Sequence, residues 1–402
     1  MTGLLRTWSA SLLLALGGTV AEADEAAFTG ADPAALVVAD QVWLYPTGGD
    51  GALHAWSRSP DGSWQRGPAL IRLADIGWIP PAENRQLWAP HMSAANGRYY
   101  FYYSVGPQEP YPAKIGVAAC DTPAGPCIDS GAALIDGADA TVFAGRPAGG
   151  CADGMTPTGS GRYRFEAIDP MVYVDPASGK RLLYAGGSNG STLRVFELAP
   201  DMVSIEREVT VDQPPCFTEG AWMHDRDGTY YLSYSSGHYD RSDYSVRYST
   251  ASSPTGPWTY RGTILSSGGG HKGPGHHSFF RDPADGRWKI AYHRWEHVSG
   301  DGPYRGERQV AIDRVTYARN GTIRGTTCAR GPKSSISWGR AARTSHHPTP
   351  AASRADKAQQ PARGQPNDPG PSRVFCCPHF YVIGFSIACA NLGHNKANNI
   401  DI

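Results

Sequence analysis

The sequence predicts an all-β protein, a five-bladed β-propeller followed by a disordered C-terminal tail. The first observation is composition. The 402 residues include 48 glycines and 32 prolines, and only 18% are charged, which suits many short strands joined by tight turns. The second is a pattern that recurs five times along the chain. The third is that no stretch has the periodicity of a long amphipathic helix.

The N-terminus predicts a signal peptide over residues 1–23. Arg6 precedes a short apolar run, Leu12–Leu16, which leads to an Ala-x-Ala site at Ala21-Glu22-Ala23. The run is too short to span a bilayer. We therefore expect a secreted protein, extracellular or periplasmic; the alternative is an ordinary N-terminal helix.

Five similar units follow. Each opens with a polar residue or a Trp-Ala-Pro corner, continues as an apolar run of strand length, turns at Gly or Asp, and returns as an aromatic-rich strand. The turns include the hairpin signals Asn96-Gly97, Asp227-Gly228 and Asp285-Gly286. The units start at Ala31, Leu87, Ile168, Thr218 and Gly275. A multi-strand unit repeating every 50 to 80 residues or so is the plan of a propeller. A β-sandwich is the structural alternative, but it leaves the fivefold similarity unexplained.

The propeller domain is expected over residues 24–332, with the repeat ending near Thr322. Residues 333–402 change composition: they begin rich in Pro, Ala, Ser and Arg and show no periodicity, which is typical of disorder. Cysteines and histidines near the end could be drawn as a zinc set, but their spacing matches no standard zinc pattern. They are Cys376, Cys377, His379, Cys389 and His394.

Two cysteines predict a disulfide. Cys120 and Cys127 flank a Pro-Gly turn in the segment CDTPAGPC, and such a pair can close a small loop in an oxidising compartment. The alternative is two buried free thiols. Cys151 and Cys216 could also pair, and the sequence alone does not decide this.

The candidate catalytic residues lie at the start of each of the five units. The first strand of each propeller blade lines the central channel, so equivalent positions converge near one end of the axis. Converging carboxylates repel and raise one another's pKa, a cost usually accepted where acid–base chemistry is needed. Singly, each carboxylate could be a turn cap. The converging positions are Asp32, Trp88 to His91, Asp169, Glu219 and His276.

These residues carry a family resemblance. Asp32 in ADP, Trp88-Ala89-Pro90, Asp169 in IDPMVYVD, Glu219 in TEGAWMH and Gly273-x-Gly275-His276 together resemble glycoside hydrolase family 43. The resemblance runs from Ala31 to Thr322, in the family's order. It implies a secreted propeller that hydrolyses glycosidic bonds with inversion, commonly arabinofuranosides and xylosides of plant polysaccharides.

The resemblance also implies roles for the carboxylates. Asp32 would be the general base that activates water, and Glu219 the general acid that protonates the leaving oxygen. Asp169 would orient Glu219 and help it to keep its proton. Inversion needs a base and an acid on opposite faces of the sugar, with a water molecule between base and sugar.

Four further residues are expected at the site by position. Trp88 would be a wall for sugar stacking, with blade packing as the alternative. Arg308 matches the family's substrate-contacting arginine, with a surface salt bridge as the alternative. His276 matches a channel histidine that in many members approaches a structural calcium or its water shell; a hydrogen-bonded core residue is the alternative. His91 stands where many members have an acidic residue, so we assign it to the substrate subsite.

The predicted partner is an oligosaccharide or polysaccharide, and the chemistry requires no cofactor. Lys plus Arg equals Asp plus Glu at 37 each, so no global basic field gathers nucleic acid or anionic lipid, and no internal membrane span is expected. Alternatives are a galactofuranosidase or other glycosidase of the same family, and a non-catalytic carbohydrate-binding propeller. A fructan-active relative is disfavoured, because its Arg-Asp-Pro triplet occurs here only in a late hairpin, Arg281–Pro283. The sugar, exo or endo action and the oligomeric state stay open.

Overall fold

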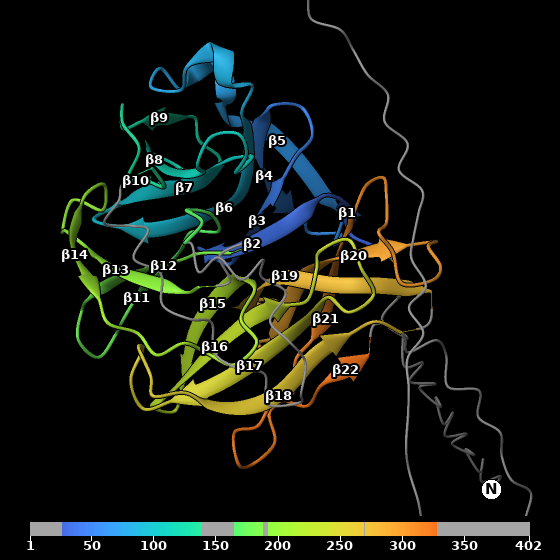
Figure 1. Ribbon diagram of the computed structural model, residues 1–402. Coiled ribbons are helices and arrows are strands. Elements are labelled where there is room, and N and C mark those ends of the chain that lie inside the picture. The colour runs from blue at the N-terminus through green and yellow to red at the C-terminus, as the bar shows by residue number, and fades with distance from the viewer. Residues whose placement is uncertain (1–25, 139–164, 188–191, 269, 328–402) are drawn as a thin grey trace, which may run out of the picture. The chain divides into compact units, whose positions relative to one another are not determined.

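The computed structural model describes residues 26–138, 165–187, 192–268 and 270–327. Over these ranges the chain forms five sheets of four or five strands, arranged as blades around a central axis (Figure 1). The predicted all-β, five-bladed propeller is confirmed. The predicted signal peptide 1–23 and tail 333–402 lie outside the described residues.

Each blade is a meander of antiparallel strands, numbered from the axis outward. Blade 1 holds β2 (Ala31–Val38), β3 (Gln41–Thr47), β4 (Ala52–Arg58) and β5 (Trp64–Arg72). Blade 2 holds β6 (Gln86–Ala95), β7 (Arg98–Gly106), β8 (Lys114–Cys120) and β10 (Ile135–Asp136), with β9 (Cys127–Asp129) also paired to β8. Blade 3 holds β11 (Met171–Val174), β12 (Arg181–Ala185), β13 (Arg194–Leu198) and β14 (Ile205–Val209).

The last two blades each take a strand from elsewhere in the sequence. Blade 4 holds β15 (Glu219–Arg226), β16 (Thr229–Ser236), β17 (Ser245–Ala251) and β18 (Thr259–Ser266), and β22 (Thr326–Thr327) adds in parallel to β18. Blade 5 holds β19 (His271–Arg281), β20 (Trp288–Glu296) and β21 (Gln309–Arg314), and β1 (Phe28–Thr29) forms its outer edge.

The hairpin signals mark the turns between the first two strands of their blades. Asn96 and Gly97 have φ of 53° and 72°, and Asp227 and Gly228 have φ of 51° and 76°. Both central residues of a type I′ turn need positive φ, so these two-residue turns have the backbone that the flanking twisted strands require. Asp285-Gly286 lies in a longer turn between β19 and β20.

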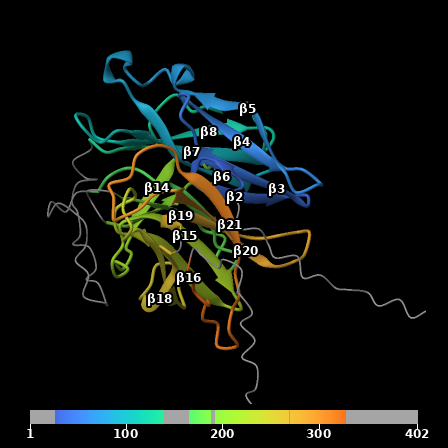
Figure 2. The ribbon, with the colours of Figure 1, turned by 90° about the vertical axis from the view of Figure 1, so that its right-hand side faces the viewer.

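The ring closes between blades 5 and 1. Strand β1 pairs with β21 at the edge of blade 5 before the chain enters β2 of blade 1, and Figure 2 shows β21 beside β2. A second connection between blades 5 and 1 joins the turn after β19 to the end of β4. Asp282, with a side chain only 1% exposed, accepts two hydrogen bonds from Arg58, at 2.5 and 2.6 Å, and lies 3.0 Å from the Lys289 ammonium. The Arg-Asp-Pro triplet of this hairpin therefore joins blade 5 to blade 1.

The core is divided among the spaces between blades. One apolar cluster, which includes Leu53 and Phe101, joins blades 1 and 2. A second, around Phe165 and Phe196, joins blades 2 and 3. A third spans blades 3 to 5, and a fourth closes the ring between blades 5 and 1. Burial of apolar surface between neighbouring blades holds the five first strands around one channel.

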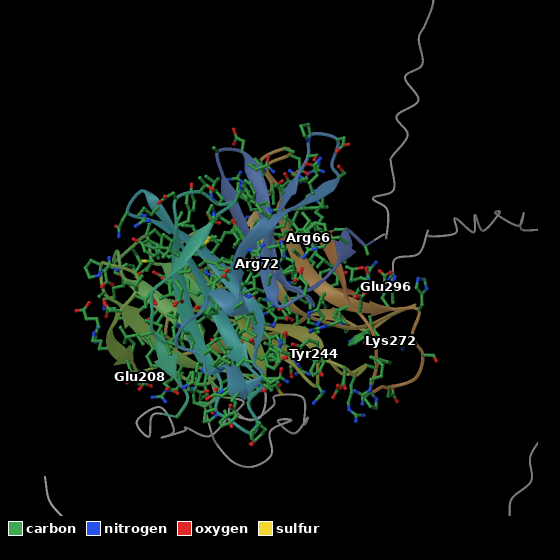
Figure 3. All side chains as sticks on the ribbon, turned by 90° about the horizontal axis from the view of Figure 1, so that it is seen from above. Arg66, Arg72, Glu208, Tyr244, Lys272 and Glu296 are labelled. Carbon is green, nitrogen blue, oxygen red and sulfur yellow. A yellow bond between two sulfur atoms is a disulfide. The ribbon has the colours of Figure 1, made fainter. Side chains whose placement is uncertain are left out.

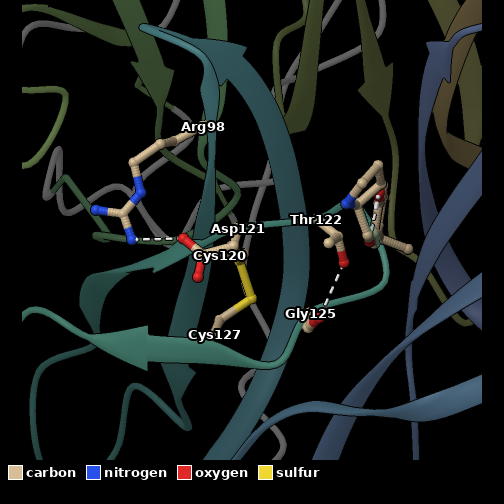
Figure 4. Close-up of a disulfide and its surroundings, with 8 residues drawn as sticks. Arg98, Cys120, Asp121, Thr122, Gly125 and Cys127 are labelled. Carbon is tan, nitrogen blue, oxygen red and sulfur yellow. Dashed lines mark hydrogen bonds and ion pairs between the residues drawn. A yellow bond between two sulfur atoms is a disulfide. The ribbon is translucent and has the colours of Figure 1, made fainter.

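The disulfide between Cys120 and Cys127 is present, which confirms that prediction (Figure 4). The two residues are a directly paired position of β8 and β9, and the loop between them is closed by a hydrogen bond from Thr122 to Gly125, 2.9 Å. Cys216 is also disulfide-bonded. Cys151, the partner considered from sequence, lies outside the described residues.

Helical structure is slight. In the described ranges it is limited to two 3-10 turns, η1 (Leu73–Asp75) and η2 (Pro81–Glu83). No helix in this part of the chain has the length and apolar character to cross a membrane.

Candidate active site

The channel ends of the five blades share one backbone feature. In each blade a residue with positive φ lies at the entry of the first strand. In four blades the first and second strands are paired up to this residue, and there the pairing register shifts as in a β-bulge. A bulge bends a strand and re-aims its side chains. The five residues are Asp32 (51°), Ala89 (40°), Asp169 (58°), Gly220 (61°) and His276 (41°).

Neighbouring blades hold these strained positions. In three cases a hydroxyl from the second strand of the preceding blade accepts the backbone N–H: Thr47 that of Ala89 at 2.7 Å, Ser104 that of Asp169 at 2.8 Å, and Ser235 that of His276 at 2.7 Å. Blade 3 has Gly186 near the equivalent place, with no side chain to offer. There the N–H of Gly220 donates to the Asp169 carboxylate instead, at 3.1 Å.

Asp32 is held as an anion. Its Oδ2 accepts a hydrogen bond from the Thr47 hydroxyl, 2.7 Å, and its Oδ1 accepts one from Arg308 Nη1, 3.1 Å. His293 Nδ1 lies 3.1 Å from the same Oδ1. Burial raises the pKa of Asp32, but the Arg308 charge, nearby His276 and the His293 hydrogen bond outweigh it and hold the pKa well below its usual range. Such a carboxylate is ionised at neutral pH.

Asp169 is held differently. It is buried, and burial together with the nearby Glu219 and Asp32 carboxylates raises its pKa to about 7, against the opposing charge of His276 and the Gly220 N–H. His276 Nδ1 lies 3.6 Å from Asp169 and 3.4 Å from Asp32, so its imidazole lies between the two carboxyl groups. The site therefore combines one ionised carboxylate with a cluster that retains a proton near neutral pH.

Glu219 begins β15 and is buried beside this cluster. Its Oε1 accepts a hydrogen bond from the Tyr244 hydroxyl at 2.6 Å. Gly187 passes so close that a Cβ there would lie 2.7 Å from the Glu219 Cβ, which limits how far the side chain can move. Burial and the Glu219 carboxylate raise the pKa of Tyr244 well above its usual range, so the phenol stays a donor.

The residue equivalence expected from sequence needs one correction. Glu219 was aligned with Asp32, Asp169 and His276, but the positive-φ position of blade 4 is Gly220. Glu219 is one residue earlier, and it pairs with Ser235 as Trp88 pairs with Ser104. Glu219 therefore reaches the shared pocket from a different point of the bulge than the two aspartates do.

These side chains line a pocket of about 350 Å³, a volume within the range of small-molecule sites. Trp88 forms part of its wall, and a Cβ on Gly106 would lie 2.1 Å from the indole, so the ring needs a glycine behind it. The Arg308 guanidinium lies over the Tyr239 ring at 5.3 Å. The pocket is lined by Asp32, Gln86, Trp88, Ala89, Gln108, Ile168, Asp169, Glu219, Tyr239, His276 and Arg308.

His91 lies elsewhere. It is 5% exposed, its Nδ1 lies 3.3 Å from the Val172 nitrogen, and its ring meets Trp222 edge-on at 5.5 Å. It lines a separate small cavity, together with Asp32, Asp169, His276 and His277. Burial lowers the pKa of His91 to about 3, so the imidazole is neutral. The geometry gives this residue packing contacts rather than a place in the pocket of Trp88.

The described residues do not form a calcium site by themselves. Calcium takes six to eight oxygen ligands, whereas His276 offers an imidazole beside two carboxyl groups that are already hydrogen-bonded. Among the described residues, no group of three or more His, Cys, Asp or Glu side chains is placed to hold a metal ion.

Sequence reasoning missed three partners of the carboxylates: Thr47, Tyr244 and His293. Thr47 and His293 follow from one signal that was available. Each lies on the second strand of its blade and pairs with the residue just before the entry position, Thr47 with Ala31 and His293 with Gly275. Tyr244 immediately precedes β17 and carried no comparable signal, because its contact with Glu219 joins the starts of two strands, β15 and β17, that are not neighbours in the sheet.

Comparisons with known proteins agree with this site. A sequence model described as "Glycosyl hydrolases family 43" matches residues 31–150 and 152–323. The Beta-D-galactofuranosidase xynD of Aspergillus niger is 33% identical over 73% of this chain and 81% of its own length. The arabinoxylan arabinofuranohydrolase of Bacillus subtilis is 28% identical over 73% of this chain, which spans 61% of that protein.

A solved structure gives the same result. It is a family 43 beta-xylosidase/alpha-arabinofuranosidase from a compost microbial metagenome, in complex with xylotriose and in a calcium-free form. It superposes with a TM-score of 0.56 and 26% identity, covering 76% of this chain and 97% of the other. The family match covers all five blades and every carboxylate of the pocket. The chain belongs to glycosyl hydrolases family 43, and it is a glycosidase that hydrolyses O-glycosyl bonds.

Proposed function

We propose that this protein is a secreted, inverting, exo-acting glycosidase that removes arabinofuranosyl or xylosyl units from plant oligosaccharides and polysaccharides. One observation carries the proposal: one pocket holds Asp32, whose pKa the Arg308 charge and its other partners hold well below the usual range, and Asp169, whose pKa burial and the neighbouring carboxylates raise to about 7, with Glu219 beside them. Inverting hydrolysis needs a base and an acid whose environments differ in this way.

In the proposed reaction Asp32 accepts a proton from a water molecule as the water oxygen forms a bond to the anomeric carbon. The bond from that carbon to the leaving oxygen breaks on the opposite face, and Glu219 donates a proton to the leaving oxygen. Arg308 and Thr47 keep Asp32 oriented. Tyr244 orients Glu219, and Asp169 keeps a proton within the acid cluster.

A second candidate substrate is a terminal galactofuranosyl unit. The Aspergillus niger relative, named a beta-D-galactofuranosidase, shares 33% identity with this chain, against 28% for the arabinofuranohydrolase. The three glycosyl units differ by small groups, which loops around the pocket discriminate. Hydrolysis of nitrophenyl α-L-arabinofuranoside, β-D-xyloside and β-D-galactofuranoside, compared by kcat/KM, separates the candidates.

The mechanism is tested on the substrate that this panel selects. Proton NMR of the first product is expected to show the inverted anomer; the retained anomer would make Asp32 a nucleophile and overturn the proposal. Asp32→Ala is expected to lower kcat by about 10²–10⁴-fold on every substrate. Glu219→Ala should be milder on a nitrophenyl glycoside, whose leaving group departs without protonation. Full activity in Asp32→Ala would overturn the role of Asp32 as the general base.

Secretion is supported by the N-terminal pattern and by the Cys120–Cys127 disulfide, which needs an oxidising compartment. Expression of the full chain in a host with a working export system should yield protein in the medium or periplasm. Mass spectrometry should find its new N-terminus after Ala23. Retention of the intact N-terminus in the cytoplasm would contradict secretion.

A further inference from the structure

One buried imidazole contacts both the proposed base and the side chain that holds the proposed acid. It belongs to His293 on β20, which is fully buried. Its Nδ1 lies 3.1 Å from Asp32 Oδ1. Its ring is parallel to that of Tyr244, with centroids 5.7 Å apart and planes 8° apart. This side chain therefore connects the two proton-transfer groups of the proposed reaction.

The charged neighbours of His293 determine which ring nitrogen carries its proton. Burial and the Arg308 charge lower the pKa of His293 to about 3, against the opposing effect of Asp32, so the ring is neutral and has a single N–H. Arg308 Nη1 lies 3.5 Å from Nε2. A guanidinium group only donates hydrogen bonds, so Nε2 is the acceptor. Nδ1 therefore carries the proton and donates it to Asp32 Oδ1.

The opposite tautomer would place like against like. The backbone N–H of Asp32 lies 3.2 Å from Nδ1 and could donate to it only if the imidazole proton were on Nε2. In that form the Nε2–H would face the Arg308 guanidinium, and the Nδ1 lone pair would face the Asp32 carboxylate. Both contacts are repulsive, so the Nδ1–H form is the stable one.

The ring of Tyr244 extends the arrangement to the acid. Tyr244, labelled in Figure 3, donates its hydroxyl hydrogen to Glu219 Oε1 at 2.6 Å. A Cβ on Gly275, the residue paired with His293, would lie 1.9 Å from the Tyr244 ring. The glycine therefore leaves space for the phenol beside the imidazole. Offset parallel rings at this separation attract each other, so His293 supports the ring that holds Glu219.

We infer that His293 is a positioning residue that fixes the base and the acid relative to each other, through its Nδ1–H on Asp32 and its ring face on Tyr244. The inference rests on the proposed function, which assigns the two proton transfers to Asp32 and Glu219. Inverting hydrolysis needs these groups at a set separation that leaves room for one water molecule. A rigid ring in contact with both sides of the pair maintains that separation.

Two substitutions separate the two contacts. His293→Asn places an amide nitrogen where Nδ1 was, so it keeps a donor to Asp32 and removes the ring beside Tyr244. His293→Phe keeps a ring beside Tyr244 and removes the donor. His224 is the matched control, because it is also buried and its ring is stacked on Tyr231, with centroids 5.0 Å apart and planes 10° apart. It does not line the active-site pocket.

The measurement is kcat and KM, per folded molecule, for an oligosaccharide and for the nitrophenyl glycoside of the same terminal sugar. His293→Phe should lower kcat about tenfold on both substrates with little change in KM, because every substrate needs activated water and the lost hydrogen bond is to a charged group. His293→Asn should lower kcat about tenfold on the oligosaccharide and less on the nitrophenyl glycoside, whose leaving group departs without protonation.

The control variants and the substrate pair exclude a merely structural role. His224→Asn and His224→Phe should lower Tm and leave both kcat values unchanged. An unchanged kcat in His293→Phe, or an equal loss on both substrates in His293→Asn, would overturn the inference.

The tautomer of His293 gives a test that needs no activity. Nitrogen-15 NMR of the imidazole groups distinguishes the two neutral forms, and signals lost in whichever His293 variant folds belong to His293. A neutral ring with its proton on Nδ1 is expected at pH 7. A proton on Nε2, or a charged ring, would overturn the hydrogen bonding inferred for His293. Absence of hydrolysis by the wild-type protein refutes the proposed function instead, so the two failures are distinguishable.

Discussion

The ion pair between blades 1 and 5 allows the contribution of ring closure to the free energy of unfolding to be measured. Asp282 is buried and accepts a bidentate hydrogen bond from Arg58, a contact from Lys289 and the Ala284 N–H. Asp282→Ala would remove the anion that both cations contact at the blade boundary, where their side chains are only 19% and 16% exposed. Breaking a buried pair in this way costs about 3–5 kcal/mol. Because both cations keep some access to water, we expect about 3 kcal/mol, which lowers Tm by roughly 6 °C or more.

The assay is urea unfolding followed by tryptophan fluorescence, at pH 7 and at pH 3. The hydrogen bonds from Arg58, the Ala284 N–H and Lys289, together with the Lys289 charge, outweigh burial and hold the pKa of Asp282 well below its usual range. The stabilisation is therefore fully present above the carboxyl's unfolded pKa, near 4, and shrinks as pH falls toward the folded pKa. The difference between wild type and Asp282→Ala should be largest at pH 7 and smaller at pH 3.

A matched control lies in the same turn. The Asp285 side chain is 34% exposed, and Arg287 Nη1 lies 3.9 Å from its carboxylate. It also accepts the Arg287 N–H within the turn, at 2.9 Å, so Asp285→Ala should cost about 1 kcal/mol or less. Arg58→Met combined with Asp282→Ala should recover part of the loss, because no unpaired charge remains on Arg58. Equal stability of Asp282→Ala and Asp285→Ala would refute the assignment of ring closure to this pair.

Three further predictions concern the site and the disulfide. Arg308→Gln removes the charge that holds the pKa of Asp32 low, so the acidic limb of kcat/KM should move to higher pH while Arg308→Lys moves it less; an unmoved limb in Arg308→Gln would contradict that role. Asp169→Asn removes a group whose pKa is about 7, so the alkaline limb of the kcat/KM profile should move to lower pH. The Tm of Asp169→Asn should also exceed that of wild type at pH 8 but not at pH 4. The reason is that a carboxyl group with a raised folded-state pKa costs stability only as the pH climbs above its unfolded-state pKa. Cys127→Ser should lower Tm without changing kcat, since the disulfide lies at β8 and β9. Non-reducing peptide mapping that finds both thiols free in exported wild-type protein would remove the reason for the effect.

The sequence by itself determined the fold class and the main carboxylates. Five repeats of strand, turn and aromatic strand can bury their apolar faces only against one another, which predicts blades and places their entry residues at one end of a channel. Asp32 and Asp169 follow from that periodicity, and Glu219 lies one residue before the equivalent position, Gly220. The Asn96-Gly97 and Asp227-Gly228 turns follow from local backbone preference, because both positions need positive φ.

Tertiary structure alone decided how those carboxylates differ. Asp32 is ionised because Arg308 and His293, from blade 5, reach it across the blade boundary, whereas Asp169 retains a proton to about pH 7 because it is buried beside Glu219. The sequence also placed His91 in the substrate subsite, while packing puts it outside the active-site pocket, against Trp222. The physical reason is common to these cases. A strand's period fixes which residues face the channel, but a one-residue bulge and the side chains of the neighbouring blade fix where each one points and which charges surround it.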